Sequence, residues 1–231
     1  MFDFKEFSLT DARCGMKIGT DGVLLGAWVD IKGIRSVVDA GAGCGLISLM
    51  IAQRTPVADI TAVEIESDAA ADCRENFMLS PWRDRLSVVE ADFNLFSSDK
   101  GVDLIVSNPP YFTDGGRAPL KKRACARHED SLGIKSLVHR ASDMLSDNGR
   151  LAVICPSEKE ECLIYEAEMS RMKLRRICHV HTVEGKPSTR IMCEFARNDG
   201  PVSINSVTIR DSKGEYTSGF KSLTRDFYLA F

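Results

Sequence analysis

Short apolar runs alternate with stretches of helical spacing along most of the chain, and this alternation constrains the fold more than any other feature. Helical spacing is clearest over 67–80 and 134–146. Continuous apolar runs are typical of strands buried on both faces of a parallel sheet. The runs that we expect to be strands are SVVDA (36–40), DITAVEI (59–65), RLSVVEAD (85–92), VDLIVSN (102–108), GRLAVICP (149–156), LRRICHVHTV (174–183) and STRIMCEFAR (188–197). The pattern predicts an α/β fold with a seven-stranded, mostly parallel Rossmann-like sheet.

Only turn residues, VEGKPS (183–188), separate the last two predicted strands. We therefore expect these strands to form an antiparallel hairpin at one edge of the sheet. Thr20 is expected to cap a helix ahead of the first strand. The length suits a single domain over 1–231, with residues 1–34 ahead of a Rossmann-like core over 35–197 and a C-terminal extension over 198–231. The extension alternates weakly, and we predict no element there.

The composition is that of an ordinary globular protein. Apolar residues make up 44% and charged residues 27% of the chain, which argues against disorder. There is no basic segment followed by an apolar core at the N-terminus, and no run approaches the ~20 apolar residues of a membrane span, so we expect a cytoplasmic protein. The eight cysteines are scattered without a CxxC pair, which favours reduced, buried thiols. His179 and His181 alternate on one predicted strand but lack a third ligand, so no metal is expected.

A glycine-rich turn follows the first predicted strand. Residues 37–49 read VVDAGAGCGLISL, with Gly41, Gly43 and Gly45 at alternate positions. Glycines permit tight turning and close approach of a ligand, and the N-terminus of the next helix offers unpaired N–H groups. The second strand reaches Glu64, 23 residues after Gly41, which is the spacing of an acid that binds ribose hydroxyls. The turn, with Asp39 before it, is predicted to bind a nucleoside cofactor, a plain tight turn being the alternative.

The turn lacks the third glycine of a dinucleotide site, because position 46 is Leu46. A cofactor with a ribose and an adenine but no pyrophosphate fits better, and S-adenosylmethionine meets that description. Near the end of the third predicted strand, Asp92 is placed to accept a hydrogen bond from the adenine amino group, with Ile65 and Phe93 against the ring. Asp92 would equally suit a helix cap or a turn.

The fourth predicted strand runs into the sequence NPPY (108–111). Pro109 and Pro110 have fixed φ and no N–H, so this segment is a rigid corner that cannot continue a sheet ladder. The side-chain oxygen of Asn108 and the Pro109 carbonyl can accept hydrogen bonds from one planar NH₂ group. Such hydrogen bonds favour the charge that develops as nitrogen attacks a sulfonium methyl group, and Tyr111 would stack on the substrate ring. A capped strand end with a packed tyrosine is the structural alternative.

These residues resemble those of the Rossmann-like, S-adenosylmethionine-dependent amino methyltransferases with an (N/D)PP(Y/F/W) motif. The chain is more closely similar to the bacterial family that methylates the exocyclic amino group of the adenosine 3′ of the anticodon in a valine tRNA. The resemblance spans roughly residues 2–230 and rests on ARCGMKIGTDGVLLGAW (12–28), NPPYFTDGGRAPLKKRACARHE (108–129) and GKPSTRIMCEFAR (185–197). It implies a methyltransferase fold in which residues 1–34 form a cofactor lid, with Lys17, Thr20 and Asp21 near the cofactor. It also implies that Asn108 borders both the cofactor and the target base.

Basic residues cluster directly after the NPPY segment. A formal net charge of −3 is not typical of a nucleic-acid binder, so RNA binding must rest on a local patch. Between Gly115 and His128 there is no acidic residue, and the basic ones are Arg117, Lys121, Lys122, Arg123 and Arg127. We expect this patch to hold tRNA phosphates, a solvated loop being the alternative. Lys186 and Arg190 are a second candidate for RNA binding, and would equally suit exposed hairpin charges.

Two further functions are compatible with these motifs. Protein glutamine methyltransferases that act on release factors share NPPY, but they usually carry a helical domain before the glycine turn, where this chain has only about 35 residues. Another RNA or DNA adenine methyltransferase is a variant of the first hypothesis. A scaffold that has lost activity is the non-enzymatic alternative, and the intact NPPY argues against it. We expect a monomer.

Overall fold

An eight-stranded sheet forms the centre of the computed structural model, which describes residues 1–98, 100–110 and 132–231. Its strands are β3 (Ser36–Ala40), β4 (Asp59–Glu64), β5 (Leu86–Glu90), β6 (Val102–Ser107), β7 (Leu145–Pro156), β8 (Lys173–Val183), β9 (Arg190–Ala196) and β10 (Ser203–Arg210). They are arranged in the order β10-β8-β9-β7-β6-β3-β4-β5. All neighbours pair in parallel except those of β9, which is antiparallel to β7 and β8. The predicted α/β fold with a mostly parallel sheet is confirmed.

The predicted strands all form, the antiparallel hairpin among them, and one strand that was not predicted is added outside the hairpin. β8 and β9 are antiparallel, as predicted, and β9 joins the hairpin to β7. The edge position is taken by β10, which pairs in parallel with β8 and lies in the C-terminal extension, where no element was predicted. β7 also begins earlier than predicted, because Leu145 pairs with Val102.

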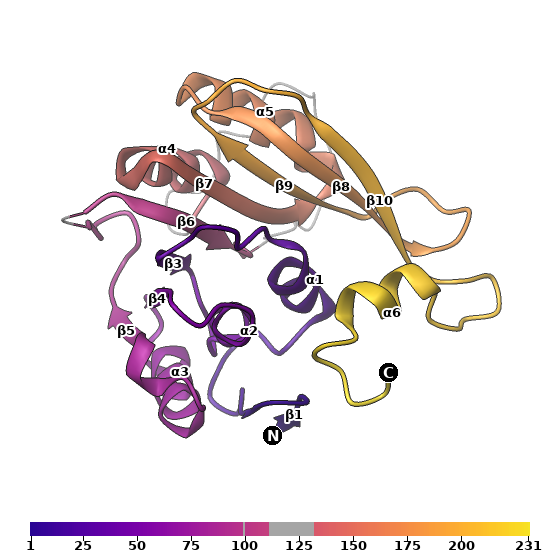
Figure 1. The fold of residues 1–231 in the computed structure, drawn as a ribbon, viewed down its shortest axis with the longest axis horizontal. Coiled ribbons are helices and arrows are strands. Elements are labelled where there is room, and N and C mark those ends of the chain that lie inside the picture. The colour runs from indigo at the N-terminus through magenta and orange to yellow at the C-terminus, as the bar shows by residue number, and fades with distance from the viewer. Residues whose placement is uncertain (99, 111–131) are drawn as a thin grey trace.

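Helices cover both faces of the sheet (Figure 1). α4 (Ile134–Met144) and α5 (Glu160–Met169) pack on one face, where Leu137 and Leu163 join the core formed by β6, β7 and β9. α1 (Thr20–Trp28), α2 (Leu46–Arg54) and α6 (Ser218–Thr224) pack on the other, with Ile51 and Phe220 in a second core cluster. α3 (Ser67–Leu79) packs beside α2. The strands are therefore buried on both sides, as their continuous apolar runs indicated.

The helix ahead of the first strand begins one residue earlier than predicted. Val23, Leu24, Ala27 and Trp28 are buried, as predicted. Gly19, in an extended conformation, is the N-cap, and Thr20 is the first helical residue. The prediction that Thr20 caps this helix is therefore wrong, because the chain turns into the helix one residue earlier.

The two ends of the chain pack against each other (Figure 1). The N-terminal segment forms a small antiparallel pair of strands, β1 (Phe2–Asp3) and β2 (Ser8–Leu9). The backbone N–H of Lys5 donates to the Phe227 carbonyl at 2.9 Å, and its ammonium group donates to the carbonyls of Arg225 and Phe231, each at 2.6 Å. The C-terminal extension thus extends the sheet and anchors the N-terminal segment.

The cysteines of the described part of the chain do not all behave as expected. Free, buried thiols are found at Cys14, Cys44, Cys73, Cys155, Cys178 and Cys193. Cys162, on α5, is disulfide-bonded, so the expectation of reduced thiols throughout is wrong at this position. Within the described ranges, the helices are too short or too polar to cross a membrane.

Candidate active site

The carboxyl ends of the parallel strands meet at one edge of the sheet, which is where open α/β sheets bind ligands. The glycine turn follows β3 at Ala40, and the Asn-Pro-Pro segment follows the neighbouring strand β6 at Ser107. The Ser107 hydroxyl is fully buried and donates to the Ala40 carbonyl at 2.7 Å. The predicted cofactor turn and the predicted target-base motif therefore start side by side, because a direct hydrogen bond joins the ends of the two strands that precede them.

The glycine turn has a backbone that only glycine adopts readily. Gly41, Gly43 and Gly45 have φ values of 70°, 57° and 85°. Gly45 is the N-cap of α2, and a Cβ at this position would lie 2.6 Å from the Phe77 ring. The Gly41 N–H donates to the Val63 carbonyl at 2.9 Å, which ties the turn to β4. Any other residue at Gly45 would be both strained and in collision with α3.

The Glu64 carboxylate holds the glycine turn from the end of β4. Its Oε2 accepts from the Gly43 N–H at 2.7 Å, and its Oε1 accepts from the Glu66 N–H at 2.9 Å. The carboxylate is largely buried. Each carboxylate oxygen can accept a second hydrogen bond, as a ribose hydroxyl would require.

Asp39 lies at zero exposure beneath the turn. Its Oδ2 accepts from the Ser48 N–H at 3.1 Å and from the Ser48 hydroxyl at 2.8 Å. Its Oδ1 is buried without a hydrogen-bond partner among the described residues. Burial raises the pKa of Asp39 to about 7, against the hydrogen bonds from Ser48. A buried polar atom of this kind calls for a partner that the described residues do not supply.

The residues predicted to surround the adenine differ in their exposure. Ile65, directly after Glu64, is 60% exposed and presents an apolar side chain at the sheet edge. Phe93 is 3% exposed and belongs to the core, so it offers little surface to a ligand. The Asp92 Oδ1 accepts from the Asn94 N–H at 2.8 Å, which is the turn-capping role that the sequence left open. Oδ2 of Asp92 makes no hydrogen bond within the described residues.

β6 ends at Ser107, directly before the Asn-Pro-Pro corner, as the prolines predicted. Asn108 is half-buried and Pro109 is buried. Leu132, the first described residue after 111–131, lies beside the glycine turn, because its side chain is 3.6 Å from the position of a Cβ on Gly41. The predicted site residues that lie outside the described residues are Tyr111, Arg117, Lys121, Lys122, Arg123 and Arg127.

The predicted lid residues lie close to the same edge but make contacts of their own. The Lys17 ammonium group donates to the Asp11 carbonyl within the N-terminal segment. Thr20 is exposed at the start of α1. Asp21 forms an ion pair with Arg190, the first residue of β9. The structure thus joins Asp21, which was predicted to lie near the cofactor, to Arg190, which was predicted to bind RNA. Lys186, the other residue of the second RNA-binding candidate, is exposed in the β8–β9 turn.

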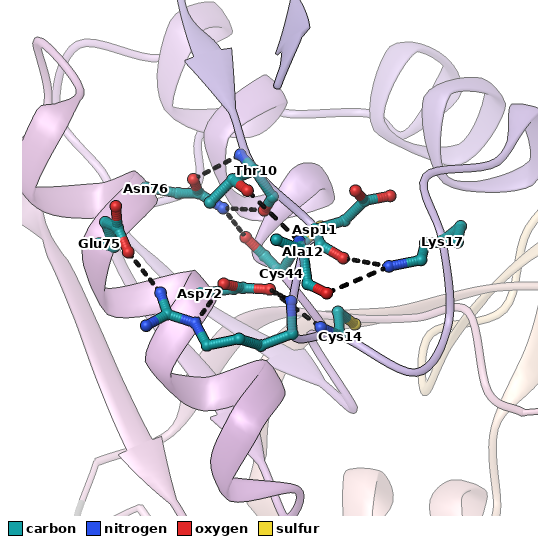
Figure 2. Close-up of polar contacts among 10 residues, drawn as sticks. Thr10, Asp11, Ala12, Cys14, Lys17, Cys44, Asp72, Glu75 and Asn76 are labelled. Atoms are coloured by element: carbon teal, nitrogen blue, oxygen red, sulfur yellow. Dashed lines mark hydrogen bonds and ion pairs between the residues drawn. The ribbon is translucent and has the colours of Figure 1, made fainter.

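Sequence reasoning missed two buried polar residues of α3, Asp72 and Asn76. Both bind the backbone of residues 10–14, which we call the N-terminal strap (Figure 2). The available signal was their spacing of four, which places them on one face of a helix beside the apolar residues Cys73 and Phe77.

The described residues contain no group of three metal-binding side chains. Nε2 of His179 lies 3.3 Å from a Glu160 carboxylate oxygen. Nδ1 of His181 lies 2.8 Å from the Lys186 carbonyl. The two histidines therefore have separate partners on the surface.

Comparison with known proteins identifies the family. The model of the methyltransferase small domain matches residues 17–176. A protein of Phocaeicola vulgatus named tRNA1(Val) (adenine(37)-N6)-methyltransferase is 41% identical over 228 residues, which are 99% of this chain and 97% of that protein. The chain belongs to this methyltransferase family. An Aliivibrio fischeri protein with the same name is 40% identical to this chain over 228 residues, which are again 99% of this chain and 97% of that protein.

Solved structures confirm the methyltransferase fold. A protein from Agrobacterium tumefaciens described as a predicted O-methyltransferase matches with a TM-score of 0.70 at 19% identity, over 89% of this chain and 96% of that one. The glycopeptide N-methyltransferase MtfA, in complex with S-adenosylmethionine, matches with a TM-score of 0.57 at 13% identity, over 84% and 93%. At these identities the likeness concerns the fold alone.

Proposed function

We propose that this methyltransferase transfers a methyl group from S-adenosylmethionine to the exocyclic N6 of an adenosine in tRNA, the nucleotide 3′ of the anticodon of a valine tRNA. The observation that carries the proposal is the hydrogen bond between Ser107 and Ala40, because it sets the glycine turn next to Asn108. The names of relatives that match nearly the whole chain support the same substrate.

The glycine turn and the two acids near it would hold the cofactor. Gly41 and Gly43 leave the backbone open to a ligand, and Glu64 would accept hydrogen bonds from the ribose hydroxyls. Oδ1 of Asp39 would gain the partner that it lacks within the described residues. Ile65 would cover one face of the adenine, with Asp92 at the adenine amino group. The cofactor supplies an electrophilic sulfonium methyl group.

The Asn-Pro-Pro corner would bind the target amine. The Asn108 side-chain oxygen and the Pro109 carbonyl accept its two protons, which favours the charge that develops on nitrogen in the transition state. No strong base is required, because the product nitrogen loses a proton readily to solvent. Tyr111 would stack on the adenine.

The basic segment after the corner would bind the tRNA backbone. The flanking residues support this, because Pro110 belongs to the corner and Leu132 lies against Gly41. The residues that we propose for phosphate contacts are Arg117, Lys121, Lys122, Arg123 and Arg127. Lys186 would add a contact from the β8–β9 turn. We assign Arg190 instead to the lid, because its Nε is engaged by Asp21.

A release-factor methyltransferase fits the described residues less well. The residues ahead of β3 form a small strand pair, the N-terminal strap and α1, all of which pack on the core or on the C-terminal extension. They therefore act with the core as one domain that covers the cofactor turn, rather than as a separate module that grips a protein substrate.

Methyl transfer from labelled S-adenosylmethionine to separate pools of tRNA, rRNA and release factors tests the proposal. We expect label in the tRNA pool, recovered as N6-methyladenosine after nucleoside digestion. A valine tRNA with guanosine in place of the target adenosine is the control and should remain unlabelled. Label that appears only in protein would contradict the proposal.

A further inference from the structure

α3 carries two fully buried polar side chains on the face that it turns toward the cofactor turn. Asp72 and Asn76 are 0% and 1% exposed. Their spacing of four places them one above the other on the helix. Burying an amide or a carboxylate costs free energy unless each polar atom finds a partner, so the partners indicate what these residues do.

Asn76 joins the N-terminal strap to the cofactor turn (Figure 2). Its Oδ1 accepts from the Thr10 N–H at 2.8 Å, and its Nδ2 donates to the Thr10 carbonyl, also at 2.8 Å. The same Nδ2 donates to the carbonyl of Cys44 at 2.9 Å. Since Cys44 lies between Gly43 and Gly45, a single side chain holds the strap and the glycine turn together.

Asp72 fixes the next part of the strap. Its Oδ2 accepts from the N–H groups of Arg13 and Cys14 at 2.8 and 2.9 Å, and its Oδ1 accepts from the Arg13 Nε at 2.6 Å. The Arg13 guanidinium also contacts Glu75 on the helix surface. Burial opposes ionisation, but the hydrogen bonds from Arg13 and Cys14 hold the pKa of Asp72 below its ordinary value. The Cys14 Sγ in turn lies 3.7 Å from the position of a Cβ on Gly43.

We propose that Asp72 and Asn76 are positioning residues that hold the N-terminal strap over the glycine turn, so that cofactor affinity depends on how well the strap is docked. The inference rests on the proposed cofactor role of this turn. Loss of the Asn76 amide removes the hydrogen bond to the Cys44 carbonyl that orients the turn, and release of the strap moves Cys14 away from Gly43. The hydrogen bonds of Asp72 and Asn76 connect the strap to α3 and the glycine turn rather than to β6, so the effect falls on cofactor binding rather than on the chemical step.

Asn76→Asp is the sharpest test, because it keeps the shape and replaces the donating NH₂ group with an oxygen that faces two carbonyls. We expect the dissociation constant for S-adenosylhomocysteine, measured by calorimetry, and the KM for S-adenosylmethionine to rise roughly tenfold or more. The kcat at saturating cofactor should stay within about twofold, because the acceptor side of the site is untouched. Asn205→Asp, the same change at an exposed position of β10, is the matched control and should alter neither constant.

Hydrogen exchange separates this role from general stabilisation. The Thr10, Arg13 and Cys14 N–H groups should exchange slowly in the wild-type protein, and more slowly with S-adenosylhomocysteine bound. In Asn76→Asp they should exchange fast, while amides of β6 and β7 stay protected. A folded Asn76→Asp variant that binds the cofactor with wild-type affinity would overturn the proposal.

Arg13→Gln serves if Asn76→Asp does not fold, because Arg13 is exposed and its replacement leaves the Asn76 hydrogen bonds in place. We expect cofactor binding about threefold weaker or more, and an unchanged affinity would overturn the inference. If the wild-type protein itself bound no S-adenosylhomocysteine, the cofactor role of the glycine turn would fail, and the inference with it.

Discussion

Arg190 and Asp21 form an ion pair, with 2.8 Å between Nε and Oδ2, that joins the start of β9 to the start of α1. Both side chains are half-buried, at 33% and 26% exposure. Arg190 is the register partner of Pro156, so the pair lies at the carboxyl edge where β3 and β6 also end. The start of α1 and the β8–β9 hairpin are thereby joined to each other beside the candidate active site.

Substitution of either partner of this pair should loosen α1 without affecting the chemistry. We expect Asp21→Asn and Arg190→Gln each to raise the KM for S-adenosylmethionine by about two- to fivefold, since a partly exposed pair contributes about 1 kcal/mol or less. The double variant should be no worse than the poorer single variant, which a double-mutant cycle measures. A change confined to the KM for tRNA in Arg190→Gln would instead favour the phosphate contact indicated by the sequence.

Asn108→Ala should separate binding from catalysis. It removes an acceptor for the target amine, so we expect kcat to fall by roughly 10²–10³-fold. The affinity for S-adenosylhomocysteine, measured by calorimetry, should change little. Asn205→Ala, at an exposed position of β10, is the control for the same substitution. A near-normal turnover in Asn108→Ala would exclude the proposed role of the Asn-Pro-Pro corner.

The basic segment should make tRNA binding depend on salt. The double substitution of Arg123 and Arg127 by alanine is expected to raise the KM for tRNA. It should also reduce the steepness with which the logarithm of the tRNA binding constant falls with the logarithm of the salt concentration, by about 1.4–1.8, because two side chains that bind phosphates are removed. Measurement of the KM for tRNA at several salt concentrations, from low to physiological, gives this slope. Replacing Arg83 and Arg171, which are exposed and lie away from the carboxyl edge, is the charge-matched control. An unaltered slope would place the RNA contacts elsewhere.

Asp39 should make stability depend on pH in a defined direction. Burial raises its pKa in the folded protein to about 7, above the ordinary value of 3.8, so the folded state keeps the proton longer than the unfolded state does. The free energy of unfolding is therefore highest below pH 4 for this group and falls as the pH rises through 7, by up to about 4 kcal/mol.

Asp39→Asn removes this titration. The stability of the wild-type protein relative to Asp39→Asn should therefore fall between about pH 4 and pH 7 and level off above pH 7, as measured by urea unfolding at each pH. Asp84→Asn, at an exposed position, should show a constant difference from wild type. A constant difference for Asp39→Asn as well would mean that the carboxyl group is ionised throughout.

The elements that position the site could be predicted from the sequence because their signals are local. β3, β4 and β6 are short apolar runs, and Gly41 to Gly45 mark a turn whose positive φ values require glycine. The spacing from this turn to Glu64 follows from one crossover helix. These features depend on neighbours within about thirty residues, which a periodicity argument can use.

Features that depend on distant pairing could not be predicted in the same way. The edge of the sheet beside β8 is occupied by β10, whose outer residues are exposed and therefore alternate weakly. Asp72 and Asn76 stand among charged residues in SDAAADCRENFMLS, and their polarity resembles that of a solvated helix face. Only the fold shows that this face meets residues 10–14 and the Cys44 carbonyl. Likewise, nothing local connects Asp21 to Arg190.

The buried Ser107 hydroxyl has a consequence for the reaction as a whole. Its hydrogen bond to the Ala40 carbonyl fixes the end of β6 relative to the end of β3 in the free protein. In the proposed reaction, the separation between methyl donor and methyl acceptor would thus be preorganised in the scaffold, rather than assembled when the two substrates arrive. A related enzyme could then become specific for another tRNA through changes in the loops that border the site, while the line of methyl transfer stays constant.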